Sequence, residues 1–143
     1  MKSFSNKKKI AKTWFKNLRN EICNEFLNLE KKKSKKKIQF IKKKWIKSKK
    51  KSEGGGEMAL LRDGNIFEKV GVNISEVSGK FDNKYKKQIP GAEKNPNYWA
   101  AGISLVAHFK NPKIPSLHFN TRYIVTTKEW FGGGMDVTPV YSR

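Results

Sequence analysis

The sequence predicts an α+β fold in which an amphipathic helix packs against an antiparallel sheet. Near the N-terminus, apolar residues recur at every fourth position, which is typical of one side of a helix. Beyond residue 53, strand-like segments are separated by the turn signals Asp63-Gly64 and Asn111-Pro112. Strands joined by short turns pair antiparallel, so we expect one sheet built from strands that are neighbours in the chain.

The composition of the chain changes at residues 53 and 54. Residues 1–53 contain 20 Lys and Arg against 4 Glu, a net charge of +16, whereas residues 54–143 contain 12 Lys and Arg against 8 Asp and Glu, a net charge of +4. We therefore divide the chain into a lysine-rich segment, residues 1–53, made of an amphipathic helix and a basic linker, and a sheet region, residues 54–143. A chain of 143 residues is long enough for one modest domain.

The predicted helix extends from near Ser5 to Glu30. A helix of this kind either packs its apolar face on a sheet or lies on a membrane surface, and the three glutamates in its C-terminal half weaken the membrane interpretation. Its apolar stripe comprises Ile10, Trp14, Leu18, Ile22 and Phe26, widened by Phe15 and Leu29. Its polar face comprises Lys7, Lys12, Lys16, Arg19, Asn20 and Asn24.

The lysines that follow the helix have two interpretations. Residues 31–37 and 47–53 are self-repelling charged stretches, expected to be solvated connections, and residues 38–46 between them are more structured, with Phe40 and Trp45 as anchors. Alternatively, residues 2–51 form a basic surface that binds nucleic acid or anionic lipid. Aromatic residues are sparse among the lysines and no nucleic-acid-binding motif is present, so we do not expect a nucleic-acid partner.

The first part of the sheet region contains two strand-like runs, residues 58–61 and 66–77, on either side of the first turn signal. An interruption of the second run predicts a bend or bulge near Gly71. Residues 79–98 are polar and predict a surface loop with a short helical turn. The glycines at 54–56 are followed by neither Lys-Ser/Thr nor a helical pattern, which excludes a phosphate-binding P-loop.

Both histidines of the chain lie in residues 102–123, which predict two strands joined by a turn. On the second strand His118, Asn120 and Arg122 recur at period two, so their side chains leave one face of that strand. A guanidinium matches a carboxylate bidentately, an amide both donates and accepts, and an imidazole titrates near neutrality. We therefore expect this row to bind an anionic substrate and to transfer a proton.

Further candidate residues flank this row. His108, on the first strand, could bind a metal together with His118, but a catalytic zinc usually has three protein ligands, which leaves a two-histidine hydrolase incomplete. Two large aromatic residues precede the glycines at 132–134, for which we expect a packed loop that lets the backbone approach a ligand. Asp136, just after them, could accept a hydrogen bond from an N–H group or pair with Arg122.

The single cysteine, Cys23, permits no intrachain disulfide, which fits a reducing compartment. It lies on the predicted helix without a histidine nearby in the sequence, so we do not expect it to be a nucleophile. No apolar run reaches the ~18–20 residues of a membrane span, and the basic N-terminus lacks the apolar region of a secretory signal. We expect a cytoplasmic protein.

The sequence resembles the oxygen-dependent coproporphyrinogen-III oxidases of haem synthesis in four blocks. Three are GGGEMALLRDGNIFEKVGVNIS at 54–75, GISLVAHFKNPKIPSLHFNTRY at 102–123 and WFGGGMDVTP at 130–139, and the fourth, weaker one is WFKNLRNEICNEF in the helix. The resemblance implies a large, flat antiparallel sheet with helices on both sides, and a homodimer. It implies oxidative decarboxylation of two propionates of coproporphyrinogen III to vinyl groups, giving protoporphyrinogen IX. Molecular oxygen is then the co-substrate, no organic cofactor is implied, and a divalent metal ion is left open.

By position, the resemblance implies a substrate site on the two central strands. Ser104 matches a serine that contacts the substrate, and Asn120, Thr121 and Arg122 match a substrate-binding triplet. A substrate with four propionates would suit the Arg122 guanidinium, because this planar fork pairs with carboxylates.

The catalytic residues that the resemblance implies are His118, Arg122 and Asp136. His118 matches a proposed proton donor, and Arg122 with Asp136 matches a pair that holds and deprotonates a pyrrole N–H group. Removal of that proton prepares the electron-rich pyrrole for direct reaction with oxygen. His108 and His118 match histidines assigned as metal ligands.

The chain also departs from the family pattern. Members of the family run to roughly twice its length, so we expect it to correspond to the N-terminal half, with residues 54–143 as an incomplete catalytic domain truncated at the C-terminus. Glu129 stands where many members have a tryptophan, and Val140 where an aromatic residue is common. We expect the chain alone to be weakly stable or inactive, because its sheet would have an uncovered edge.

Overall fold

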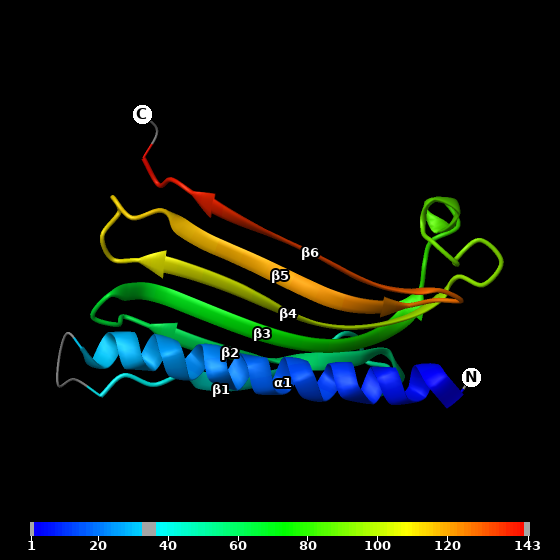
Figure 1. Ribbon diagram of the computed structural model, residues 1–143, viewed down its shortest axis with the longest axis horizontal. Helices are drawn as coiled ribbons and strands as arrows, with labels where there is room; N and C mark the ends of the chain where they lie inside the picture. The colour runs from blue at the N-terminus through cyan, green and yellow to red at the C-terminus, as the bar shows by residue number, and fades with distance from the viewer. Residues whose placement is uncertain (1, 33–36, 142–143) are drawn as a thin grey trace.

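The computed structural model describes residues 2–32 and 37–141, which form a six-stranded antiparallel sheet with a long helix along one face (Figure 1). Each strand pairs with the next one in the chain, so the order in the sheet is β1-β2-β3-β4-β5-β6. The predicted sheet-dominated α+β fold is therefore confirmed. The elements are α1 (Lys2–Lys31), β1 (Ile41–Ile46), the 3₁₀ helix η1 (Lys51–Glu53), β2 (Gly54–Arg62), β3 (Phe67–Lys80), the 3₁₀ helix η2 (Lys86–Gln88), β4 (Asn97–Phe109), β5 (Ser116–Val125) and β6 (Glu129–Thr138).

The β2–β3 hairpin forms where the turn signal predicts it. Asp63 has a φ of 51°, in the left-handed region that such tight turns require. The predicted bulge near Gly71 is wrong, because the ladder irregularity lies between Phe67 and Lys69. Gly71 instead pairs regularly, and a Cβ atom there would lie 3.3 Å from Cγ2 of Val106, so this glycine leaves space for its neighbour.

The helix α1 packs mainly on β3 and β4, as expected for an amphipathic helix on a sheet. The predicted stripe is only partly correct. Ile10 and Trp14 are 60% and 59% exposed, whereas Arg19, expected on the polar face, is 2% exposed. At 3.6 residues per turn, positions four apart advance by about 40° around the helix axis, so a stripe at every fourth residue winds out of the interface.

Two buried charged side chains join α1 to the sheet. Arg19 Nη1 lies 2.8 Å from Glu57 Oε1, and hydrogen bonding to this guanidinium lowers the pKa of Glu57. At the C-terminal end of α1, the fully buried Glu30 carboxylate accepts hydrogen bonds from the three backbone N–H groups of residues 65–67 in the β2–β3 turn. Cys23, on the same helix, is buried, and burial raises the pKa of its thiol, which agrees with the expectation that it is not a nucleophile.

Side-chain alternation gives the sheet two faces. The helix face packs on α1, and in the described part of the chain the opposite face, called the open face below, carries no α-helix. The second helical layer implied by the resemblance therefore stays a prediction. The strands curve along their length (Figure 1), so the sheet is less flat than the resemblance implies. The buried sheet residues of the helix face are Ala59, Leu61, Phe67, Val70, Val72, Ala101, Ile103, Ala107, Tyr123 and Val125.

The change in composition at residues 53 and 54 falls inside this sheet. β1 belongs to the lysine-rich segment, yet it pairs along its length with β2, for example Trp45 with Gly56. The charged stretch 47–53 ends in η1. In the other charged stretch, 31–37, residues 33–36 lie outside the described residues. Among the helices of the described residues, none combines the length and the apolar character that crossing a membrane requires.

Candidate functional site

The polar residues predicted from the sequence gather on the open face, around β4 and β5. In the register of these strands Ser104 lies opposite Asn120 and Gly102 opposite Arg122. Side chains directly opposite each other on neighbouring strands are about 5 Å apart. The residues that the register brings to this face are Ser104, His108, His118, Asn120, Arg122 and Asp136.

Thr121 is the one predicted site residue whose side chain lies on the helix face. Successive residues of a strand point to opposite faces, so a contiguous triplet cannot present three side chains to one ligand. The Thr121 hydroxyl donates to the Gly132 carbonyl at 3.4 Å. Its side chain is therefore separated from those of Asn120 and Arg122, and its role in substrate binding stays a prediction.

Arg122 is exposed on the open face and is available to an anion. Its Nη2 donates to Asn120 Oδ1 at 3.4 Å, and within the described residues it forms no ion pair. Gly102 provides room beside it, because a Cβ atom at Gly102 would lie 2.8 Å from Cβ of Arg122. A guanidinium without a protein carboxylate can pair with a carboxylate of a ligand.

His118 and Asp136 form a hydrogen-bonded pair across β5 and β6, with 2.7 Å between Nδ1 and Oδ1. The Thr138 hydroxyl donates to the same carboxylate at 2.7 Å, and these two hydrogen bonds, Thr138 first, lower the pKa of Asp136. Because Asp136 is then a carboxylate near neutral pH, Nδ1 of His118 carries the proton and Nε2 is left for a ligand. Of the two alternatives for Asp136, a direct pair with Arg122 does not form in the described residues, since Arg122 lies opposite Gly132, four residues away on β6. Joint action of Arg122 and Asp136 on a pyrrole N–H group stays a prediction.

His108 and His118 lie close together, with ring centroids 5.8 Å apart and planes at 85°. Within residues 2–32 and 37–141, no group of three His, Cys, Asp or Glu side chains is placed to hold a metal ion. A catalytic zinc usually has three protein ligands, so the described residues do not form a complete metal centre. The assignment of both histidines as metal ligands stays a prediction.

Two shallow hollows adjoin Arg122 on the open face. The first, of about 350 Å³, lies over β3–β5 and is lined in part by Asn73, Ser75, Tyr98, Ala100, Gly102, Ser104, Arg122 and Ile124. The second, of about 370 Å³, is lined by Asn120, Arg122, Ile124 and the glycines 132–134.

The glycines at 132–134 lie in β6 and not in the loop expected from the sequence. They pair with residues 120–122, and a Cβ atom at Gly134 would meet nothing within 4 Å. Next to Arg122, β6 therefore exposes backbone without side chains where we expected a packed loop. We call the glycines 132–134 the glycine shelf below. Close approach of a ligand to this backbone stays a prediction, now for a strand and not for a loop.

Sequence reasoning missed the part of this face that β3 contributes. Asn73 and Ser75 both line the first hollow and alternate with Val72 and Ile74, which face α1. The alternation was present in the predicted strand, but the pairing of β3 with β4 was needed to place Asn73 opposite Ser104 and Ser75 opposite Gly102.

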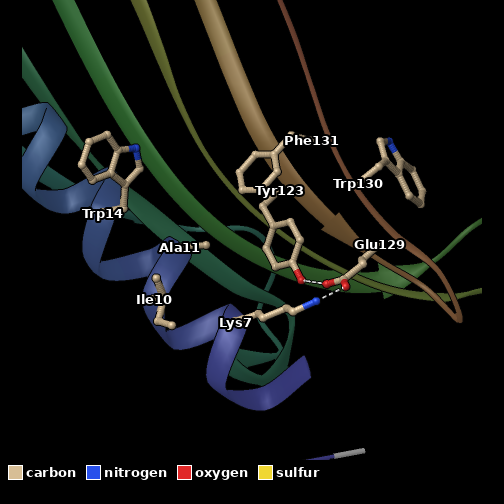
Figure 2. A pocket seen from close by; sticks show the side chains of 8 residues that line it. All are labelled: Lys7, Ile10, Ala11, Trp14, Tyr123, Glu129, Trp130 and Phe131. Carbon is tan, nitrogen blue, oxygen red and sulfur yellow. Dashed lines mark hydrogen bonds and ion pairs between the residues drawn. The ribbon is translucent and has the colours of Figure 1, made fainter. Parts of the chain in front are cut away.

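A third hollow, of about 420 Å³, lies on the helix face between α1 and the β5–β6 edge (Figure 2). In Figure 2 the Lys7 ammonium and the Tyr123 hydroxyl converge on the Glu129 carboxylate. Burial and the neighbouring Glu129 raise the pKa of Tyr123 to about 12, and hydrogen bonds from Lys7 and Tyr123 lower that of Glu129. The rest of the wall is apolar, including Trp14 and Phe131, and none of the candidate residues of the open face lines this groove.

One face of this antiparallel sheet carries a His–Asp pair, a row of glycines and an arginine that forms no ion pair within the described residues. These groups define the class of sheet proteins whose broad polar face suits an anionic ligand. Comparison with known proteins specifies this class further. Residues 10–143 match the family model described as coproporphyrinogen III oxidase, and the chain belongs to this family.

Relatives with assigned names include the oxygen-dependent coproporphyrinogen-III oxidases of Rickettsia africae and Rickettsia felis. The first is 49% identical over 138 residues, which cover 94% of this chain and 48% of the relative. The second is 49% identical over 140 residues, which cover 95% of this chain and 49% of the relative. The chain therefore spans about half the length of the curated relatives it matches.

Proposed function

We propose that this chain forms one wall of the substrate site of an oxygen-dependent coproporphyrinogen-III oxidase. The observation that carries the proposal is the exposed Arg122 guanidinium, which forms no ion pair within the described residues and borders two hollows of the open face. A tetrapyrrole with four propionates offers carboxylates to this guanidinium and a broad ring to the glycine shelf. Membership of the family supports the same substrate class.

In the proposed reaction, each of two propionates loses carbon dioxide and a hydride equivalent and becomes a vinyl group. A hydride equivalent is two electrons and one proton. Molecular oxygen takes up this hydride equivalent together with one further proton, and leaves as hydrogen peroxide. Arg122 binds a carboxylate, Asn120 and Ser104 hydrogen-bond the substrate, and the His118–Asp136 pair holds and moves a proton. Asp136 orients the imidazole through Nδ1, so that Nε2 faces the ligand.

Binding of coproporphyrin III, the stable oxidised form of the substrate, tests this proposal by fluorescence titration. Arg122→Ala is expected to weaken binding by tenfold or more, because a charge-assisted hydrogen bond is worth about 1.5–3 kcal/mol. Arg62→Ala is the matched control, since Arg62 is exposed at the far end of the same face and its loss changes the net charge equally. Equal affinities of the two variants would show that binding is non-specific attraction to a basic chain, and would refute the proposal.

Binding and not turnover is the primary readout for this chain. Within the described residues β6 pairs on one side only, and most of its residues are exposed. An edge of this kind presents unpaired N–H and C=O groups that can pair with another chain. We therefore expect self-association to compete with activity and turnover of coproporphyrinogen III by the 143-residue chain to be slow.

A further inference from the structure

Asn73 and Trp45 form a hydrogen-bonded pair on the open face, beside the first hollow. Trp45 on β1 donates from Nε1 to Asn73 Oδ1 on β3 at 2.9 Å, across the intervening strand β2. Trp45 lies opposite Gly56, where a Cβ atom would be 2.7 Å from Cζ2 of the indole. A side chain at position 56 would displace the indole, so glycine is what allows the ring to lie across β2 and reach Asn73.

The indole determines which way the Asn73 amide faces. An indole nitrogen only donates, so the atom that meets it must be the amide oxygen and not the amide nitrogen. The two N–H donors of Nδ2 are then the part of the side chain left for a ligand. Asn73 lines the hollow that Ser104 and Arg122 also line.

Asn73 also extends the line of candidate substrate contacts to a third strand. It lies opposite Ser104 in the β3–β4 register, and Ser104 lies opposite Asn120 in the β4–β5 register. Three polar side chains on adjacent strands therefore form a straight row, about 10 Å from end to end at the usual strand spacing. The row continues on β6 to Gly134, where no side chain stands above the backbone.

We propose that Asn73 is a substrate-orienting residue that donates from Nδ2 to a propionate carboxylate of the tetrapyrrole, and that Trp45 is the positioning residue that fixes its amide. This inference rests on the proposed function, because it takes the substrate class from it. Arg122 on β5 binds one carboxylate and Asn73 on β3 a second one, with β4 between them. Two separate contacts fix the rotation of a flat ring that a single contact would leave free.

Coproporphyrin III binding by an Asn73→Ala variant of the chain tests the orienting role. The variant is expected to bind about tenfold more weakly than the native chain, as for the loss of one hydrogen bond to a charged group. Asn17→Ala removes an exposed asparagine from α1 and is the matched control, with unchanged affinity expected. Circular dichroism compares the folds of the two variants.

Trp45→Phe tests the positioning role, because it keeps an aromatic ring over Gly56 and removes the N–H donor. We expect about threefold weaker binding in the native background and no further loss in the Asn73→Ala background, because Trp45 acts through Asn73. A ring that only supports the fold would weaken binding equally in both backgrounds, which would overturn the positioning role.

The outcomes separate this inference from the proposed function. If Arg122→Ala weakens binding while Asn73→Ala binds like the native chain, the inference is overturned and the proposed function stands. If the native chain does not bind coproporphyrin III, or Arg122→Ala and Arg62→Ala bind equally, the proposed function fails and the inference fails with it.

Discussion

Replacing Glu30 with alanine is expected to destabilise the chain strongly, because this carboxylate closes the β2–β3 turn. It is fully buried and accepts the backbone N–H groups of residues 65–67, including that of Phe67 at 2.9 Å. A buried hydrogen bond to a charged group contributes about 1.5–3 kcal/mol, and solvent access lowers that contribution to about 1 kcal/mol. The Phe67 bond is buried and counts as about 2 kcal/mol, and the part-buried bonds from residues 65 and 66, which water can partly replace, count as about 1 kcal/mol each, which gives a loss of about 4 kcal/mol.

Urea unfolding followed by circular dichroism measures this loss as a difference in the free energy of unfolding. Glu21→Ala is the control, since Glu21 is exposed on the same helix, and a change within about 0.5 kcal/mol is expected. A loss below about 1 kcal/mol for Glu30→Ala would refute the reasoning, because it would mean that the three N–H groups find other acceptors at little cost.

Two further predictions concern charges on the sheet. Arg19 lowers the pKa of Glu57 below its ordinary value of 4.5, so this pair stabilises the fold above about that pH and the contribution is lost as the pH falls through the lowered pKa. Glu57→Gln should therefore cost about 2 kcal/mol of unfolding free energy at pH 7 and little once the pH lies below the lowered pKa of Glu57, and an equal cost in neutral and in acidic solution would contradict the assignment. Thr138→Val should raise the pKa of Asp136 toward its ordinary value of 3.8, since the hydroxyl that stabilises the carboxylate is removed. Carbon NMR of the carboxyl groups follows this titration, and an unchanged midpoint would show that the Thr138 hydrogen bond does not stabilise the charged form.

The helix and most of the strands were predictable from the sequence because they depend on local periodicity. The period-two row of His118, Asn120 and Arg122 was predictable for the same reason, and its position on one face of the sheet is confirmed. The glycines at 132–134 were misassigned to a loop because glycine is unfavourable in strands. Pairing of β6 with β5 outweighs that preference and places the glycines beside the polar row.

The sequence by itself determined which side chains leave a strand together, since alternation is a property of the backbone. Only the tertiary structure decided which of these rows meet. It placed Asp136 opposite His118 and not Arg122, and it brought Asn73 to Ser104. It also buried Arg19 against Glu57, because the direction of a helix face depends on the surface on which the helix packs. Strand register and helix packing bring together residues that are far apart in the chain. The free energy of each such contact depends on both partners, so a local sequence pattern cannot predict it.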